Sequence, residues 1–198
     1  MADYKELRVL SGTSHLKLTD SICEYLGISN GRLNIHKFAN DNTFVQIEEN
    51  IRERDVFIVQ PFSNPVNDKI METLIMIDAA KRASAGRITT VIPYFAYGRT
   101  DKKDQPRVPI TARLIADLIS TAGANRVLTV DLHAGQIQGF FNIPVDELTA
   151  IPILTRYIKE KNIPNMVVVA VDMGATKRAR NVAAGLNVPL AIMEKRRT

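Results

Sequence analysis

The sequence has little from which a disulfide framework, a thiolate metal site or a membrane anchor could be built. Cys23 is its single cysteine, so neither an intrachain disulfide nor a cysteine-ligated metal site can form. No uninterrupted apolar run approaches bilayer-spanning length, and the first ten residues, MADYKELRVL, lack the apolar core of a signal peptide. We therefore expect a protein of the reducing cytoplasm with no membrane partner.

Aromatic residues are also scarce, at 6% of the chain. Lys and Arg total 26 against 21 Asp and Glu, giving a net charge of +5 and a pI near 9.4, a moderate excess that suits anionic ligands. A nucleic-acid-binding module would need a basic surface lined with aromatic rings, and the sequence offers only Tyr94, Phe95 and Tyr97 beside a basic segment. We expect small phosphorylated substrates and no nucleic acid.

Apolar β-branched runs alternate with amphipathic stretches along most of the 198 residues. This alternation predicts an α/β fold, with a parallel sheet and helices on both faces. Gly27, Gly86 and Gly123 are the expected helix stop signals. The expected strands cover residues 7–10, 55–60, 87–95, 166–171 and 189–193, with another starting at Val127; the expected helices cover 15–26, 68–85, 110–122, 152–161 and a stretch ending near Leu186; residues 33–38 and 43–47 form a hairpin.

Asp131 and His133 follow the apolar run that begins at Val127. In an extended chain, positions two apart point to the same side, so the carboxylate and the imidazole would emerge together at the end of a strand. One interpretation is a pair of ligands for a divalent cation that is completed by water and phosphate, as Mg²⁺ sites are. The other is a core histidine and a helix-capping aspartate.

Two glycine-containing segments are rich in basic residues. Residues 96–109, AYGRTDKKDQPRVP, form either a solvated charged loop or a mobile loop that closes over polyphosphate. Residues 172–180 follow an apolar strand with a small-residue turn and a helix start, which is a geometry that can bind anions. Gly174 could equally serve only a tight turn.

Two other features also have alternative interpretations. Phe38, at the tip of the expected hairpin, is either a core residue or a flat surface on which a base stacks. The terminal run EKRRT contains Lys195 and Arg197, and terminal charge runs are usually solvated tails.

Taken together, these segments resemble ribose-phosphate diphosphokinase, also called phosphoribosyl pyrophosphate synthetase. The resemblance extends from Phe38 to Arg197 and includes VIPYFAYGRTDKK, RVPITARLIADL, TVDLHAGQIQGFFNIPVDEL, VDMGATKRAR and EKRR. The pattern DLHAxQIQGFF is long and unlike general nucleotide motifs. Neither a Walker A lysine motif nor a protein-kinase glycine loop is present in the sequence.

The resemblance implies a phosphoribosyltransferase-like domain and transfer of a diphosphoryl group from Mg²⁺-ATP to the anomeric hydroxyl of ribose 5-phosphate. The products would be phosphoribosyl pyrophosphate, used in nucleotide biosynthesis, and AMP. It also implies a homo-oligomer, commonly a hexamer. Such a transfer requires mainly alignment and charge neutralisation, with no nucleophilic side chain.

The resemblance assigns roles to individual positions of this sequence. It implies ATP binding by two groups of residues, metal binding by three side chains, a pyrophosphate loop and two catalytic cations. The ATP-binding residues would be Phe38, Asn40, Asp41, Asn42, Arg99, Thr100, Lys102 and Asp104; the Mg²⁺ ligands His133, Asp172 and Asp131; the pyrophosphate loop Asp172, Met173, Gly174, Ala175 and Thr176; and the catalytic residues Lys195 and Arg197.

Some positions depart from the family pattern. The family commonly has Glu where this sequence has Asn42, Gln where it has Thr100 and Gly where it has Ala175. Loss of the Glu removes an acceptor for the adenine amino group, although an Asn carbonyl could replace it.

Nothing in the sequence matches the acidic, glycine-containing loop, DDxxDTxGT or similar, that holds ribose 5-phosphate in the family. We therefore expect residues 1–150 to form an ATP-binding domain and residues 151–198 the opening β-α-β part of a second, incomplete domain. The hypothesis that follows is a fragment of a longer chain, inactive or nearly so alone. The alternative is a non-catalytic subunit that assembles with active partners.

Overall fold

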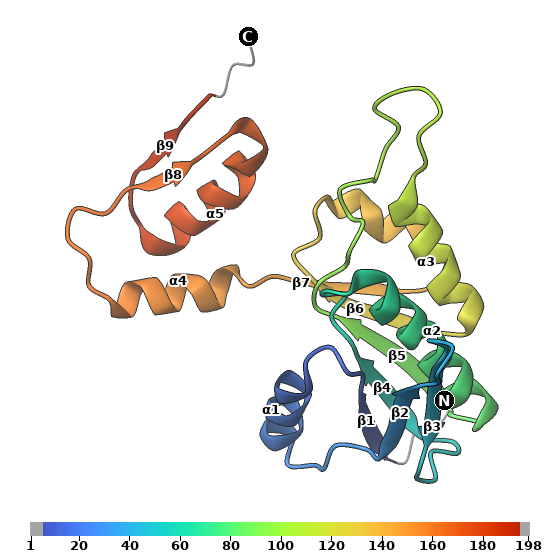
Figure 1. The fold of residues 1–198 in the computed structure, drawn as a ribbon. Coiled ribbons are helices and arrows are strands. Elements are labelled where there is room, and N and C mark those ends of the chain that lie inside the picture. The colour runs from blue at the N-terminus through green and yellow to red at the C-terminus, as the bar shows by residue number, and fades with distance from the viewer. Residues whose placement is uncertain (1–5, 195–198) are drawn as a thin grey trace. The chain divides into compact units, whose positions relative to one another are not determined.

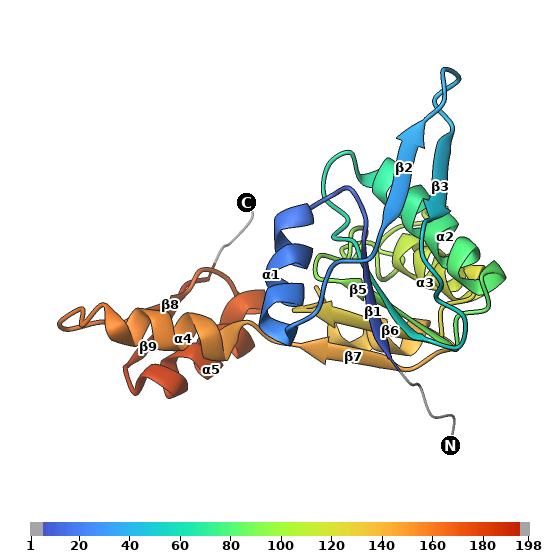
Figure 2. The same ribbon diagram turned by 90° about the horizontal axis from the view of Figure 1, so that it is seen from below.

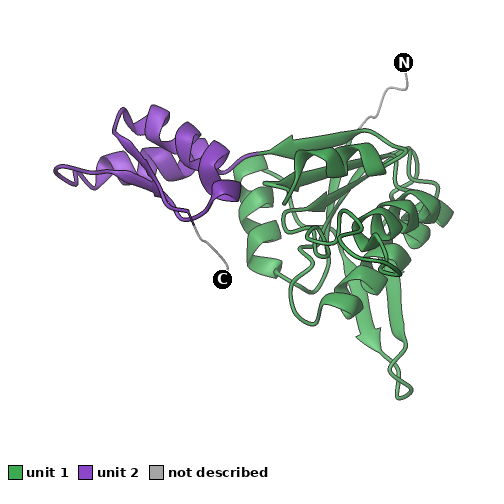
Figure 3. Ribbon diagram, turned by 90° about the horizontal axis from the view of Figure 1, so that it is seen from above, with its two compact units in different colours: residues 1–148 green, residues 149–198 purple. Residues whose placement is uncertain are grey.

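The structure is a computed structural model that describes residues 6–194. It contains two compact units, residues 1–148 and residues 149–198 (Figure 3). The predicted assignment of residues 1–150 and 151–198 to two domains stays a prediction.

Unit 1 is built on a five-stranded, all-parallel sheet (Figure 1). In spatial order its strands are β1 (Leu7–Ser11), β4 (Asp55–Val59), β5 (Arg87–Ile92), β6 (Arg126–Val130) and β7 (Val145–Leu148). From β4 onward, each strand lies next to its predecessor in the chain. Because crossovers between parallel strands are right-handed, the segments that connect these strands must lie on one face of the sheet.

Helices cover both faces of this sheet. Figure 2 shows α1 (Leu16–Leu26) on the opposite side of the sheet from α2 (Val66–Arg82) and α3 (Thr111–Ala122). Alternate strand residues face the two layers: Leu10 joins the core under α2 and α3, and Val9 joins the one under α1. The predicted parallel α/β fold with helices on both faces is confirmed.

An antiparallel hairpin, β2 (Leu33–Lys37) and β3 (Thr43–Ile47), forms where it is predicted. Its inward-facing residues, Leu33, Ile35, Val45 and Ile47, pack against the core that also contains α2. The base of the hairpin is therefore held to the body of unit 1 by apolar burial.

The helix stop signals are partly confirmed. Gly27, with a φ of 67°, and Gly123, with a φ of 121°, follow the last residues of α1 and α3. The prediction for α2 is wrong at both ends, since the helix starts at Val66 and ends at Arg82, before Gly86. Ser84 takes a φ of 60° there, so a serine occupies the left-handed position expected for the glycine.

One strand prediction in unit 1 needs correction, and one strand was not predicted. The strand predicted over residues 87–95 ends at Ile92, and the chain turns at the following residues. The edge strand β7 is not predicted from its sequence, VDEL, which lacks an apolar run. It is formed by pairing with β6, where Val127 lies opposite Val145 and Val130 opposite Leu148.

Unit 2 contains α4 (Ile151–Glu160), β8 (Val168–Ala170), the 3₁₀ turn η2 (Met173–Ala175), α5 (Thr176–Leu186) and β9 (Leu190–Ile192). β8 and β9 pair in parallel, and α5 packs on β8 and α4. The strand predicted over residues 166–171 forms as the shorter β8, but the prediction that it is buried is wrong, because Val169 and Val171 are exposed and only Ala170 in this range is buried. Unit 1 also contains a 3₁₀ turn, η1 (Gly135–Phe140), between β6 and β7.

Candidate functional site

Two loops meet at the carboxyl edge of the sheet, where parallel strands place ligand sites. One follows β5 and runs to α3, and the other follows β6 and contains η1. Gln136 Nε2 donates to Asp101 Oδ2 over 2.8 Å, and the Asp101 side chain is buried. A Cβ built on Gly98 would lie 3.4 Å from the Cβ of His133. The structure thus brings the basic segment 96–109 against the segment that carries His133.

Asp131 and His133 are placed by a turn and not by an extended strand. β6 ends at Val130, and Asp131 has a φ of 46°, so the argument that the two side chains share one side of a strand does not hold. The Asp131 N–H donates to the Leu148 carbonyl over 2.9 Å. The His133 side chain is exposed, which rules out the core-histidine interpretation.

Glu147 in β7 holds the loop after β6 in place. Its Oε1 accepts from the Leu132 N–H over 3.0 Å, and its Oε2 accepts from Gln138 Nε2 over 2.5 Å. Because both carboxylate oxygens bind the loop, its path on either side of His133 is fixed. Sequence reasoning missed this residue, since a Glu in a short polar segment carries no signal of its own.

The basic segment is anchored at its base and exposed along its length. The Thr100 N–H donates to the Tyr97 carbonyl over 2.9 Å, and the Thr100 carbonyl accepts from Ala112 N–H over 3.1 Å. Arg99, Lys102 and Asp104 are exposed, and the segment rises from the end of β5 before α3 (Figure 1). Exposed cations on a loop with a fixed base can reach a polyphosphate ligand.

The hairpin tip presents an exposed ring. Phe38 is 50% exposed, so the core interpretation is wrong, and its ring packs edge-on against His36 and Phe44. The Phe38 N–H donates to the Asn42 carbonyl over 2.9 Å, and the turn is completed by Asp41 at a φ of 67°. Asn40 and Asn42 are exposed beside the ring. This tip offers one stacking surface with amide groups next to it.

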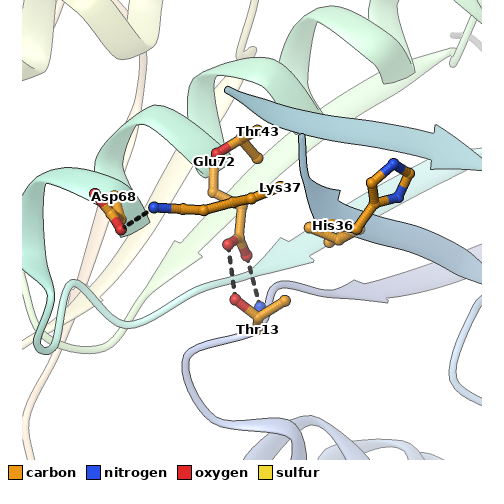
Figure 4. A pocket seen from close by; sticks show the side chains of 7 residues that line it. Thr13, His36, Lys37, Thr43, Asp68 and Glu72 are labelled. Carbon is orange, nitrogen blue, oxygen red and sulfur yellow. Dashed lines mark hydrogen bonds and ion pairs between the residues drawn. The ribbon is translucent and has the colours of Figure 1, made fainter. Parts of the chain in front are cut away.

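Lys37 connects the hairpin tip to α2 (Figure 4). Its Nζ lies 2.8 Å from Asp41 Oδ1 in the turn and 2.7 Å from Asp68 Oδ2 in the first turn of α2. Hydrogen bonds to Asp41 and Asp68 raise the pKa of Lys37 to about 12, so the side chain is a cation at neutral pH. A pocket of about 230 Å³ lies beside it, lined by Thr13, Ile35, His36, Lys37, Thr43, Asp68 and Glu72.

A buried carboxylate, Glu72, lines this pocket and connects three elements. Its Oε1 accepts from the Thr13 N–H at 2.6 Å and from Gln60 Nε2 at 2.7 Å, and its Oε2 accepts from Thr13 Oγ1 at 2.7 Å (Figure 4). Lys69 lies 3.4 Å from Oε2 and also bonds Thr13. The turn after β1, the end of β4 and α2 therefore form one hydrogen-bonded network at the carboxyl edge. None of these residues carries a sequence signal that predicts a functional role.

The predicted pyrophosphate loop forms a capped turn in unit 2. Asp172 Oδ1 accepts from the Ala175 N–H over 2.8 Å, and Thr176 begins α5. Met173 and Gly174 are exposed, as are the basic side chains of the following helix turn. Asp172 thus acts as the N-cap of η2.

The predicted metal ligands lie in both units, with Asp131 and His133 in unit 1 and Asp172 in unit 2. Within residues 6–194, no group of three or more His, Cys, Asp or Glu side chains could hold a metal ion. A Mg²⁺ site of the kind predicted needs only one or two protein ligands beside phosphate and water, and carboxylate and imidazole donors can supply them. Lys195 and Arg197, the predicted catalytic residues, lie outside the described residues.

Comparison with known proteins identifies the family. The sequence model of the N-terminal domain of ribose phosphate pyrophosphokinase matches residues 7–123. The chain belongs to this family. A ribose-phosphate pyrophosphokinase of Rhizobium meliloti is 55% identical over 192 residues, which cover 96% of this chain and 62% of the relative. A ribose-phosphate pyrophosphokinase of Neisseria meningitidis serogroup A is 52% identical over 198 residues, which cover 100% of this chain and 61% of the relative.

A solved structure agrees with this family assignment. The phosphoribosylpyrophosphate synthetase of Mycobacterium smegmatis matches with a TM-score of 0.94 at 45% identity, over 98% of this chain and 66% of that chain. The chain thus spans about 60% of the length of the curated relatives it matches. Among the described residues of this pyrophosphokinase-family chain, no helix is long and apolar enough to cross a membrane.

Proposed function

We propose that the protein carries the ATP-binding part of ribose-phosphate pyrophosphokinase activity. In this reaction the anomeric hydroxyl oxygen of ribose 5-phosphate bonds to the β-phosphorus of ATP. The bond between that phosphorus and the oxygen bridging to the α-phosphate breaks, AMP leaves, and the hydroxyl proton passes to solvent. The observation that carries the proposal is the contact of the segment holding Arg99 and Thr100 with the segment holding His133, through Gln136 and Asp101.

Each part of unit 1 has a role in this proposal. Phe38 stacks on adenine while the amides of Asn40 and Asn42 meet its edge, close to Asp41. Arg99 and Lys102 neutralise the triphosphate, and Thr100 and Asp104 complete the same loop. Since phosphoryl-type transfer depends on alignment and charge neutralisation, these contacts suffice without a nucleophilic side chain.

The family implies Mg²⁺, for which Asp131, His133 and Asp172 are the proposed ligands. Bound there, the ion would neutralise phosphate charge and orient the transferring group. The turn of Asp172, Met173, Gly174, Ala175 and Thr176 would bind pyrophosphate through its backbone N–H groups. Lys195 and Arg197 would stabilise the transition state. We further propose a homo-oligomer, with a hexamer as the expected form, and a cytoplasmic location.

The test is AMP formation from Mg²⁺-ATP with and without ribose 5-phosphate, together with equilibrium ATP binding. Wild type, His133→Ala and His15→Asn would be compared. His15 caps α1 by accepting from the Leu18 N–H, and asparagine keeps that acceptor, so this variant controls for loss of a histidine elsewhere.

Sugar-dependent AMP that is lost in His133→Ala and kept in His15→Asn would support the proposal. AMP formation by wild type that His133→Ala leaves unchanged would contradict the role of His133. Bound ATP without AMP would indicate either a truncated chain or a non-catalytic chain that assembles with active partners. Failure to bind ATP would reject the proposed function.

A further inference from the structure

The hairpin tip is held to unit 1 differently from the hairpin base. At the base, Leu33, Ile35, Val45 and Ile47 bury apolar surface against the core. At the tip, Phe38, Asn40, Asp41 and Asn42 are exposed. Lys37, the residue directly before Phe38, forms the ion pair that joins this end of the hairpin to α2, with Asp68. The direction in which the tip points therefore depends on Lys37.

The geometry around Lys37 is that of a clamp between a turn and a fixed point. Asp68 lies in the first turn of α2, where the helix dipole favours a carboxylate. That helix is itself fixed to the sheet through buried Ile70 and Glu72. On the other side, Asp41 sits in the turn at a φ of 67°, so the same ammonium group binds the turn from within.

We propose that Lys37 is a positioning residue for nucleotide binding: by bridging Asp41 and Asp68, it fixes the orientation of the tip that presents Phe38 to the base. This inference rests on the proposed function, since it takes the ligand of Phe38 to be a purine nucleotide. Lys37 itself does not bind the nucleotide in this proposal. A clamp of this kind lowers the conformational entropy that binding would otherwise have to remove from the turn.

The experiment measures two quantities independently. Amide hydrogen exchange of residues 38–42 without nucleotide reports the mobility of the tip, and titration with Mg²⁺-ATP reports affinity. The variants are Lys37→Met, which keeps side-chain length without charge, Asp68→Asn and Lys37→Arg. The matched control is Asp78→Asn, which removes the Asp78–Arg82 ion pair on the surface of the same helix.

We expect Lys37→Met and Asp68→Asn to accelerate exchange at residues 38–42 and to raise the Kd for ATP about threefold to tenfold, the scale of losing one or two exposed ion pairs. Lys37→Arg should retain both properties, and Asp78→Asn should change neither. In an active preparation, the KM for ATP should rise while kcat stays constant, because the clamp acts on binding alone.

The outcomes distinguish a failure of the Lys37 proposal from a failure of the proposed function. Unchanged exchange in Lys37→Met, with ATP still bound by wild type, overturns the clamp alone. Weaker ATP binding without faster exchange overturns it too, and indicates direct contact between Lys37 and the nucleotide. A wild type that binds no ATP overturns the proposed function and the role of Lys37 with it.

Discussion

Replacement of Glu72 by alanine should destabilise unit 1 more than any surface substitution on the same helix. The Glu72 side chain is only 6% exposed, and it accepts hydrogen bonds from Thr13 and Gln60 and pairs with Lys69, whose side chain is 13% exposed. Alanine would leave the Thr13 N–H and the Gln60 amide without their acceptor, and a largely buried ammonium without its counter-ion. Breaking such a buried pair costs about 3–5 kcal/mol.

This loss can be converted into a melting temperature. For a domain of the size of unit 1, residues 1–148, each kcal/mol shifts the Tm by roughly 2–4 °C, so we expect a decrease of about 6–20 °C. Glu72→Gln, which keeps one acceptor oxygen and the side-chain shape, should cost about half as much. The assay is thermal unfolding followed by circular dichroism, with urea unfolding to give the free energy.

Asp78→Ala is the matched control, because Asp78 also lies in α2 and pairs with Arg82 at 2.7 Å on the exposed side. This substitution should leave the Tm nearly unchanged. If Glu72→Ala and Asp78→Ala shifted the Tm equally, the buried network would not stabilise the carboxyl edge, and the reasoning would be refuted.

Three further predictions follow from the same structure. Gly12→Ala should lower the free energy of unfolding in urea by about 2 kcal/mol, because its Cβ would overlap the buried Gln60 amide. At Gly27 a Cβ meets no atom within 4 Å, so Gly27→Ala should cost only about 1 kcal/mol, for its left-handed backbone. Equal costs would refute the close packing at Gly12. Burial, with a smaller effect of Asp20, raises the pKa of the Cys23 thiol. Ellman's reagent should therefore label this single cysteine much more slowly in the native chain than in urea. Equal labelling rates would show that Cys23 is exposed. Because the pKa of Lys37 is raised, its contribution to stability is fully present below the unfolded pKa of 10.5 and is lost as the pH rises through about 12. Amide exchange at the hairpin tip, corrected for intrinsic rates, should therefore be constant between pH 6 and 9. A change in that window would contradict the partners assigned to Lys37.

Local sequence signals predicted the elements whose ends are determined by their own residues. The left-handed glycines 27 and 123 end α1 and α3 where expected, and the apolar run of β4 marks a buried central strand. β7 could not be predicted, because a four-residue polar edge strand forms only through its pairing with β6. The end of α2 was also missed, since Ser84 takes a left-handed conformation that its side chain does not signal.

The residues of the candidate site also differ in whether the local sequence predicts them. Arg99 and His133 lie in continuous motifs, so sequence reasoning could identify them, and the structure places their segments together. Glu72, Gln60 and Lys37 act through partners that lie 12 to 59 residues away in the chain. Their importance depends on tertiary contacts, for which a single sequence has no local signal. The strand geometry first used to place Asp131 beside His133 failed because the chain turns at Asp131.

The most direct test of the proposed site is a map of amide hydrogen exchange in this chain with and without Mg²⁺-ATP. The account predicts slower exchange in three segments on nucleotide binding: the hairpin turn at residues 37–42, the basic segment at residues 96–104 and the His133 segment at residues 131–141. Mg²⁺ with AMP serves as a control that lacks the polyphosphate and should protect the basic segment less. Protection confined to other segments, or none at saturating ATP, would contradict the assignment of a nucleotide site to this edge of the sheet.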